Sequence, residues 1–227
     1  MRLGACTSPD VRRLAPCRLL LPLGATEQHG PHLPLETDTL IATALADAAA
    51  GSRPAVAVAP ALPYGASGEH AGFPGTLSLG QAAVEMSIVE LVRSADGFAG
   101  VTLVSWHGGN AEPVARAVAR LRGEGREVHA WEPALSGGDA HAGRIETSLM
   151  LAIAPGRVGH LRPLGATRPV AQLMPVLREH GVAAVSPNGV LGDAREATRA
   201  EGEALLGALT ADLGAFLDAT RPAGVAG

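Results

Sequence analysis

The fold of this chain is decided around the stretch Leu21-Pro-Leu-Gly-Ala-Thr-Glu-Gln-His-Gly-Pro-His-Leu-Pro-Leu-Glu-Thr-Asp38. Its glycines and prolines predict a loop that follows a short apolar strand and precedes a helix. This loop concentrates carboxylate and imidazole side chains, namely Glu27, His29, His32 and Asp38. Such groups are rarely buried unless they are paired or bound to metal, so the loop predicts half of a metal site.

Short apolar strands alternate with longer Ala- and Leu-rich helical stretches along the chain. The predicted strands cover residues 18–23, 55–59, 101–105 and 127–131. The predicted helices cover residues 39–50, 79–95, 111–124, 146–154, 170–180 and 195–220. This order predicts an α/β three-layer sandwich, in which helices cover both faces of a mainly parallel sheet. Ligands of such sheets bind at the carboxyl ends of the strands.

Length and composition limit the kind of protein. With 227 residues and 47% hydrophobic content, we expect a single domain over residues 1–227, with poorly ordered ends at 1–16 and 221–227. A net charge of -4 gives no basic footprint, so we expect a small soluble substrate and no nucleic acid. No run reaches the roughly 18 to 20 apolar residues that span a bilayer. The absence of lysine excludes Schiff-base chemistry and a Walker-type phosphate loop.

The cysteines and the first apolar run bear on the compartment. Cys6 and Cys17 show no metal-binding spacing and form no disulfide framework, which favours a reducing, cytoplasmic setting. An arginine pair precedes the apolar run 19–25 in a way that loosely resembles a signal peptide. The run is short, and cleavage near its end would place the mature start directly on the candidate site, so we favour the cytoplasmic interpretation.

Three loops that follow predicted strands carry the remaining polar side chains. The first holds Glu27 and His29, the second contains Trp106-His107-Gly-Gly-Asn110, and the third contains Asp139-Ala-His-Ala-Gly-Arg-Ile-Glu146. Zinc, manganese and iron(II) accept mixed imidazole and carboxylate ligands, and one carboxylate can bridge two ions about 3.5 to 4 Å apart. Asp38 is the natural bridge. The candidate metal ligands are therefore Glu27, His29, Asp38, His107 and Glu146.

Each of these side chains also has an ordinary structural role when taken alone. His107 could cap the helix that follows it, and Glu146 could complement the dipole in a first helical turn. Asp38 could be the N-cap of the helix predicted from residue 39. It is their combination at the ends of parallel strands that favours a metal site.

Several motifs resemble the creatininase (creatinine amidohydrolase) family, and they cover nearly the whole chain. They are Gly24-Ala-Thr-Glu-Gln-His-Gly-Pro-His-Leu-Pro-Leu-Glu-Thr-Asp-Thr39, His107-Gly-Gly-Asn110 and Asp139-Ala-His-Ala-Gly-Arg-Ile-Glu-Thr-Ser148. Segments 62–78 and 186–193 resemble the family's substrate-side and C-terminal loops. The resemblance implies an amidohydrolase with two divalent ions, zinc, iron(II) or manganese, and a homo-oligomer, commonly a hexamer. It implies that Glu27 and His107 hold one ion, that His29 and Glu146 hold the other, and that Asp38 bridges them.

The same resemblance implies roles around the metals. His141 is similar to the family's catalytic histidine, which donates a proton to the leaving nitrogen or stabilises the oxyanion; alternatively, it only bonds backbone at a helix start. The expected substrate-binding residues are Arg144, Trp106, Glu69 and His70. Arg144 could serve a substrate carboxylate, or it could be a solvated arginine at a helix start. We expect His32 to lie outside the ligand set.

Within the family, the pattern is most similar to the peptidases of mycofactocin biosynthesis, which trim a modified precursor peptide. The segments Gly68-Glu-His-Ala-Gly-Phe-Pro-Gly-Thr76 and Ser186-Pro-Asn-Gly-Val-Leu-Gly-Asp193 carry this similarity. It implies cleavage near the C-terminus of the precursor, with release of a Val-Tyr-derived dipeptide. Creatinine hydrolases tend to carry an acidic residue where this chain has Gly109, which argues against creatinine itself. The alternatives are hydrolysis of a cyclic amide or formamide, and a non-catalytic metal-binding subunit.

Overall fold

A parallel sheet lies at the centre of the computed structural model, which describes residues 1–13, 16–51, 53–133 and 139–221. Its four strands follow the order β2-β1-β3-β4. They are β1 (Arg18–Leu23), β2 (Val56–Val58), β3 (Gly100–Ser105) and β4 (Val128–Trp131). Every neighbouring pair is parallel, and β1 pairs with β3 along its whole length.

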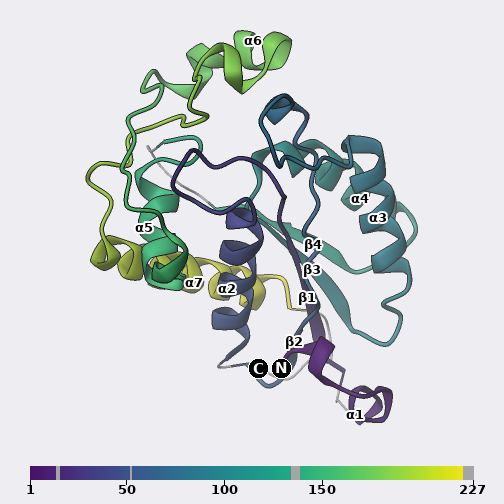
Figure 1. The fold of residues 1–227 in the computed structure, drawn as a ribbon. Helices are drawn as coiled ribbons and strands as arrows, with labels where there is room; N and C mark the ends of the chain where they lie inside the picture. The colour runs from purple at the N-terminus through teal and green to yellow at the C-terminus, as the bar shows by residue number, and fades with distance from the viewer. Residues whose placement is uncertain (14–15, 52, 134–138, 222–227) are drawn as a thin grey trace.

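Helices cover both faces of this sheet (Figure 1). One face packs against α2 (Thr37–Gly51), α5 (Arg144–Ile153) and α7 (Arg199–Ala219). The other packs against α3 (Gln81–Arg93) and α4 (Ala111–Gly123). Helix α6 (Val170–His180) lies away from the sheet and belongs to a separate small cluster of apolar side chains. The predicted α/β three-layer architecture is confirmed.

Strand β1 shows why the sheet needs cover on both sides. All six of its residues are buried. Leu19, Leu21 and Leu23 pack on the side of α3 and α4, whereas Leu20 packs on the side of α2, α5 and α7. Continuous apolar runs of this kind are typical of parallel strands, and each fully buried leucine contributes roughly 1.5 to 3 kcal/mol.

Four helices, α2, α3, α5 and α7, start two to four residues away from the sequence-based prediction, and two of these differences matter here. Helix α2 begins at Thr37, so Asp38 lies inside its first turn and is not an N-cap. Helix α7 begins at Arg199 rather than at residue 195, because the Thr198 side chain accepts a hydrogen bond from the backbone of Glu201. Such a cap marks where helical geometry starts.

The first residues of the chain lie beside β2, which is an edge strand of the sheet. The first sixteen residues, for which the sequence predicts poor order, contain a 3-10 helix (Leu3–Ala5) and α1 (Ser8–Arg12) in their described part. The carbonyl of Met1 accepts a hydrogen bond from Val58 of β2 at 2.8 Å. Of the predicted frayed end 221–227, only Arg221 is among the described residues. Within the described part of the chain, no helix is both long and apolar enough to cross a membrane.

The strand order creates a switch point between β1 and β3. The chain leaves β1 through α2 to reach β2 on one side, and then returns through α3 to β3 on the other side. The connections after β1 and β3 therefore diverge, and ligands of such sheets bind at the carboxyl ends of the strands beside this point. The loop with Glu27 and His29 follows β1, and His107 follows β3, so both lie at this point.

Candidate metal centre

The structure brings the predicted ligands together at the carboxyl ends of β1 and β3. Three groups of side chains place their ligand atoms within 4.8 Å of one another, and two of these groups share Asp38. One shared group adds Glu27 and His107, and the other adds His29 and Glu146. The third group consists of Glu27, His29 and His141.

Asp38 faces both halves of the cluster. Its Oδ1 lies 3.2 Å from His29 Nε2, and its Oδ2 lies 3.6 Å from His107 Nδ1. The first turn of helix α2 holds this side chain, which is only 1% exposed. A carboxylate that turns one oxygen toward each of two imidazoles is placed to bridge two ions.

Several buried oxygens of the cluster have no well-oriented hydrogen bond. Glu27 is 0% exposed, and neither of its carboxylate oxygens forms one among the described residues, although His70 Nε2 lies 3.2 Å from Oε1. Oδ2 of Asp38 shares this property. A buried carboxylate without partners is costly, and a bound cation removes that cost. The donor set therefore fits divalent metal ions.

The protons on the two candidate histidine ligands point the same way. Nδ1 of His29 lies 3.1 Å from the carbonyl oxygen of Glu27, and Nε2 of His107 lies 3.1 Å from that of Ala66. A carbonyl only accepts, so each of these nitrogens carries a proton. The other nitrogen of each ring faces Asp38 and becomes free for a metal ion once its own proton is displaced. Metal-binding histidines characteristically donate their second N–H in this manner.

The electrostatics of the cluster suit the exchange of protons for metal. Burial raises the pKa of Glu27 to about 8 and also raises the pKa of Glu146. Burial lowers the pKa of His29, but the neighbouring Asp38 carboxylate outweighs this effect and raises it to about 10. For Asp38, burial is outweighed in turn by His29, and the pKa is lowered. Protons thus balance the charges, and divalent ions displace such protons when they bind.

Glu146 is held by two donors. Trp106 Nε1 donates to Oε1 at 2.9 Å, and the backbone N–H of Ala142 donates to Oε2 at 2.6 Å. Ala142 has a φ of 54° and is the only non-glycine residue with positive φ in the described part of the chain. Backbone strain of this kind occurs at functional sites, where the surroundings enforce it. Sequence reasoning missed Ala142, and it assigned Trp106 to the substrate and not to Glu146.

His141 faces the cluster with one nitrogen and the backbone with the other. Its Nε2 donates to the carbonyl oxygen of Gln28 at 2.7 Å, and its Nδ1 lies 3.6 Å from Glu27 Oε1. Burial and the nearby His29 keep its pKa well below the usual range, so the ring is neutral. His141 therefore bonds backbone, as the ordinary alternative holds, and still presents a lone pair to the cluster.

Of the other histidine and carboxylate side chains considered for the site, His70 and Glu69 lie beside the cluster and His32 lies outside it. His70 Nε2 lies 3.2 Å from Glu27 Oε1, and Glu69 Oε1 lies 3.8 Å from His107 Nε2, so both belong to the rim of the cluster. His32 bonds Thr147 Oγ1 at 2.8 Å and is in none of the three groups.

Gly109 lies against this rim and has no room for a side chain. A Cβ atom there would lie 2.2 Å from the carbonyl oxygen of Ala66 and 2.7 Å from Glu69 Oε1. Larger residues at this position would therefore require the neighbouring backbone to move.

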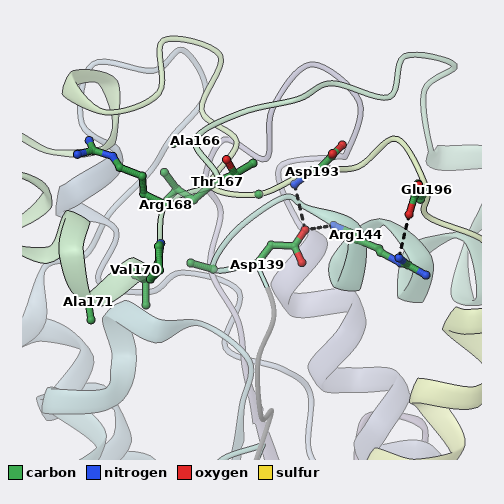
Figure 2. A pocket seen from close by; sticks show the side chains of 13 residues that line it. Asp139, Arg144, Ala166, Thr167, Arg168, Val170, Ala171, Asp193 and Glu196 are labelled. Atoms are coloured by element: carbon green, nitrogen blue, oxygen red, sulfur yellow. Dashed lines mark hydrogen bonds and ion pairs between the residues drawn. The ribbon is translucent and has the colours of Figure 1, made fainter.

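Arg144 does not join the cluster. Its guanidinium pairs with Glu201 at 2.8 Å. It also pairs with Glu196 at 3.2 Å, at the edge of a cavity of about 680 Å³ (Figure 2). In the same wall, Asp139 accepts hydrogen bonds from the backbone N–H groups of Arg144 and Asp193. The predicted substrate role of Arg144 would require its guanidinium to exchange these partners.

Comparison with known proteins agrees with this geometry. The family model for creatininase, described as creatinine amidohydrolase, matches residues 4–217. A mycofactocin precursor peptide peptidase from Mycolicibacterium smegmatis is 51% identical over 210 residues, covering 88% of this chain and 84% of that protein. The creatinine amidohydrolase of Pseudomonas putida is 32% identical over 224 residues, covering 84% of each. A mutant creatininase described as Zn-Zn type matches with a TM-score of 0.78 at 27% identity, over 97% of this chain and 98% of that one. The predicted family is confirmed: this chain belongs to the creatininase family of metal-dependent amidohydrolases.

Proposed function

We propose that this protein is a dinuclear metal-dependent peptidase that hydrolyses an amide bond of a precursor peptide. The observation that carries the proposal is the buried Asp38 carboxylate, which is shared by two groups of possible ligands. The relative with the greater identity is named for a precursor peptide, which supports a peptide over creatinine as the substrate. The scissile bond that we expect lies near the C-terminus of the modified peptide and releases a Val-Tyr-derived dipeptide.

In this proposal Glu27 and His107 hold one ion, His29 and Glu146 hold the other, and Asp38 contacts both. Bound there, the ions would supply Lewis-acid chemistry, polarising the amide carbonyl and making water acidic enough to attack at neutral pH. Zinc, manganese and iron(II) all accept this mixture of imidazole and carboxylate. Trp106 and Ala142 hold Glu146 in the orientation that the site needs.

His141 would move the proton. Its neutral ring presents the Nδ1 lone pair to the cluster, while Nε2 keeps its hydrogen on the carbonyl oxygen of Gln28. His141 therefore acts first as a base that takes a proton from the attacking water at Nδ1. The resulting Nδ1–H then donates that proton to the leaving amide nitrogen, which departs as an amine. The base must act before the acid, because the neutral ring has no proton to give at Nδ1.

One experiment separates this function from its alternatives. Protein purified anaerobically and loaded with zinc, manganese or iron(II) is analysed for metal content, then incubated with the modified precursor peptide, creatinine and a formamide. We expect two ions per chain and cleavage of one peptide bond, detected by mass spectrometry. Cleavage of only a small amide would favour the small-molecule alternative, and bound metal without any turnover would favour a structural site. The cytoplasmic location and the hexamer remain predictions.

A further inference from the structure

The side-chain amide of Gln28 has a fixed orientation. Gln28 lies between Glu27 and His29 in the chain and is 5% exposed. Its Oε1 accepts from the backbone N–H of Gly30 at 2.9 Å, and its Nε2 donates to the carbonyl oxygen of Gly189 at 3.0 Å. A backbone N–H only donates and a carbonyl only accepts, so these two partners determine which end of the amide is nitrogen.

Two imidazole nitrogens lie near this amide nitrogen, but only one of them can accept from it. His70 Nδ1 is 2.9 Å away and His141 Nε2 is 3.1 Å away. His141 Nε2 carries the hydrogen that it donates to the Gln28 carbonyl, so it cannot accept another. An amide nitrogen has two hydrogens, and Gly189 takes the first. The second is therefore donated to His70 Nδ1.

This leaves His70 with its own proton on Nε2, which faces Glu27 Oε1 at 3.2 Å. His29, His107 and His141 have the opposite arrangement, since each donates to a backbone carbonyl and turns its other ring nitrogen, the one able to bind a metal ion or a proton, toward the cluster. We propose that Gln28 is a positioning residue that holds His70 in its Nε2–H tautomer. His70 thereby presents a hydrogen-bond donor to the cluster and is kept out of the set of metal ligands.

The C-terminal loop makes room for this arrangement. Gly189 has a φ of +80°, and a Cβ atom there would lie 1.8 Å from Gln28 Oε1. A side chain at this position would displace the amide and strain the backbone. Gly189 thus supplies both the space for Gln28 and the carbonyl that takes one of its hydrogens.

The test uses Gln28→Met, which keeps the length of the side chain and removes the donor. On the proposed function, we expect kcat for peptide cleavage to fall roughly 10- to 100-fold with unchanged metal content, a range typical of losing the partner of a site histidine. The matched control is Gln172→Met on the exposed face of α6, with no expected change. In a His70→Gln background, the amide N–H of the new glutamine takes the place of the His70 Nε2–H. This N–H does not depend on a hydrogen bond from Gln28. There Gln28→Met is expected to lower kcat by less than in the parent.

A second readout does not depend on turnover. Nitrogen-15 NMR of histidine-labelled, zinc-loaded protein reports which ring nitrogen of His70 is protonated. We expect Nε2–H in the parent and a shift toward Nδ1–H in Gln28→Met and in Gln28→Glu, whose carboxylate accepts from Nδ1. A parent protein with Nδ1–H on His70 would overturn the proposal, as would equal losses of kcat in both backgrounds. If the peptide were not a substrate at all, the NMR result would still decide the tautomer.

Discussion

Two charged regions flank the start of α5, and they differ in how their charges are satisfied. On one side, Glu146 reaches into the cluster, where Glu27 and Asp38 are buried and have oxygens without hydrogen-bond partners among the described residues. On the other side, Arg144 and Asp193 line an open cavity (Figure 2). Both form ion pairs, Arg144 with Glu196 and Asp193 with Arg195. Among the described residues, only the first region has buried carboxylate oxygens that lack a hydrogen bond, and a cation would satisfy them.

The difference between the two regions indicates that a chemical site is marked by buried carboxylates that lack a hydrogen bond, and not by the number of charges. Exposed ion pairs gain little because water screens them. Buried charges lose their hydration and must recover it from a partner, here a metal ion. Substitutions of the same chemical kind in the two regions are therefore expected to have very different effects.

The largest contrast is expected between Asp38→Asn and Asp193→Asn. Asp38→Asn removes the charge that both ligand groups share, so we expect loss of at least one ion per chain. Turnover should fall by more than about 100-fold, the upper range for losing only the partner of a ligand. Asp193→Asn, in the cavity wall, should retain metal and turnover. Metal analysis and peptide cleavage check both variants, and an Asp38→Asn protein with full metal and turnover would show that the cluster is not the site.

His141→Ala is expected to have the next largest effect. Loss of a general acid and base lowers kcat about 10²- to 10⁴-fold, and the ions should stay because five other ligands remain. His129→Ala is the matched control, since His129 pairs with Glu127 at 2.7 Å on the surface. If the His141→Ala variant also lost metal, then the group formed by Glu27, His29 and His141 would be the one that holds an ion. His141 would then be a metal ligand and not the base.

Much of the fold and of the ligand cluster could be predicted from the sequence, because both depend on local patterns. Apolar runs and helix periodicity predict the parallel sheet, and ligands of such sheets collect at strand ends. The five predicted ligands, which the structure places together, were found from their chemical type and their positions after strands. The family motifs added the pairing of ligands, which spacing could not provide.

The rest depends on contacts between distant segments. Gln28 looked like a spacer between two ligands, since its partners Gly189 and His70 are far along the chain. Ala142 has no sequence signal for positive φ, because alanine rarely adopts it. The partners of Arg144 come from α7 and the loop before it, so its charge alone could not distinguish a substrate site from a surface ion pair.

Trp106→Phe is expected to have an intermediate effect. It keeps the aromatic ring and removes the N–H that holds Glu146 Oε1, so we expect a 10- to 100-fold loss of metal affinity or turnover. Trp131→Phe is the control, because it also removes an indole N–H from a carboxylate, that of Asp212 at 2.8 Å, but outside the cluster. Metal titration separates the two. Equal effects of both substitutions would mean that Trp106 acts only through packing.

The smallest effect is expected from Arg144→Gln, and it tests the role that the sequence suggested for this residue. A substrate carboxylate would have to displace Glu201 and Glu196 from the guanidinium, so we expect kcat/KM to change by less than about fivefold, the scale of an exposed ion pair. Arg199→Gln, which breaks a surface pair with Glu203, is the control. Precursor peptides that end in a free carboxylate or in an amide are compared for each variant. The alternative outcome is a rise in KM of about tenfold or more, seen only for Arg144→Gln and only with the peptide that ends in a free carboxylate. This result would show that the substrate carboxylate binds Arg144. The cavity beside α5 would then belong to the active site.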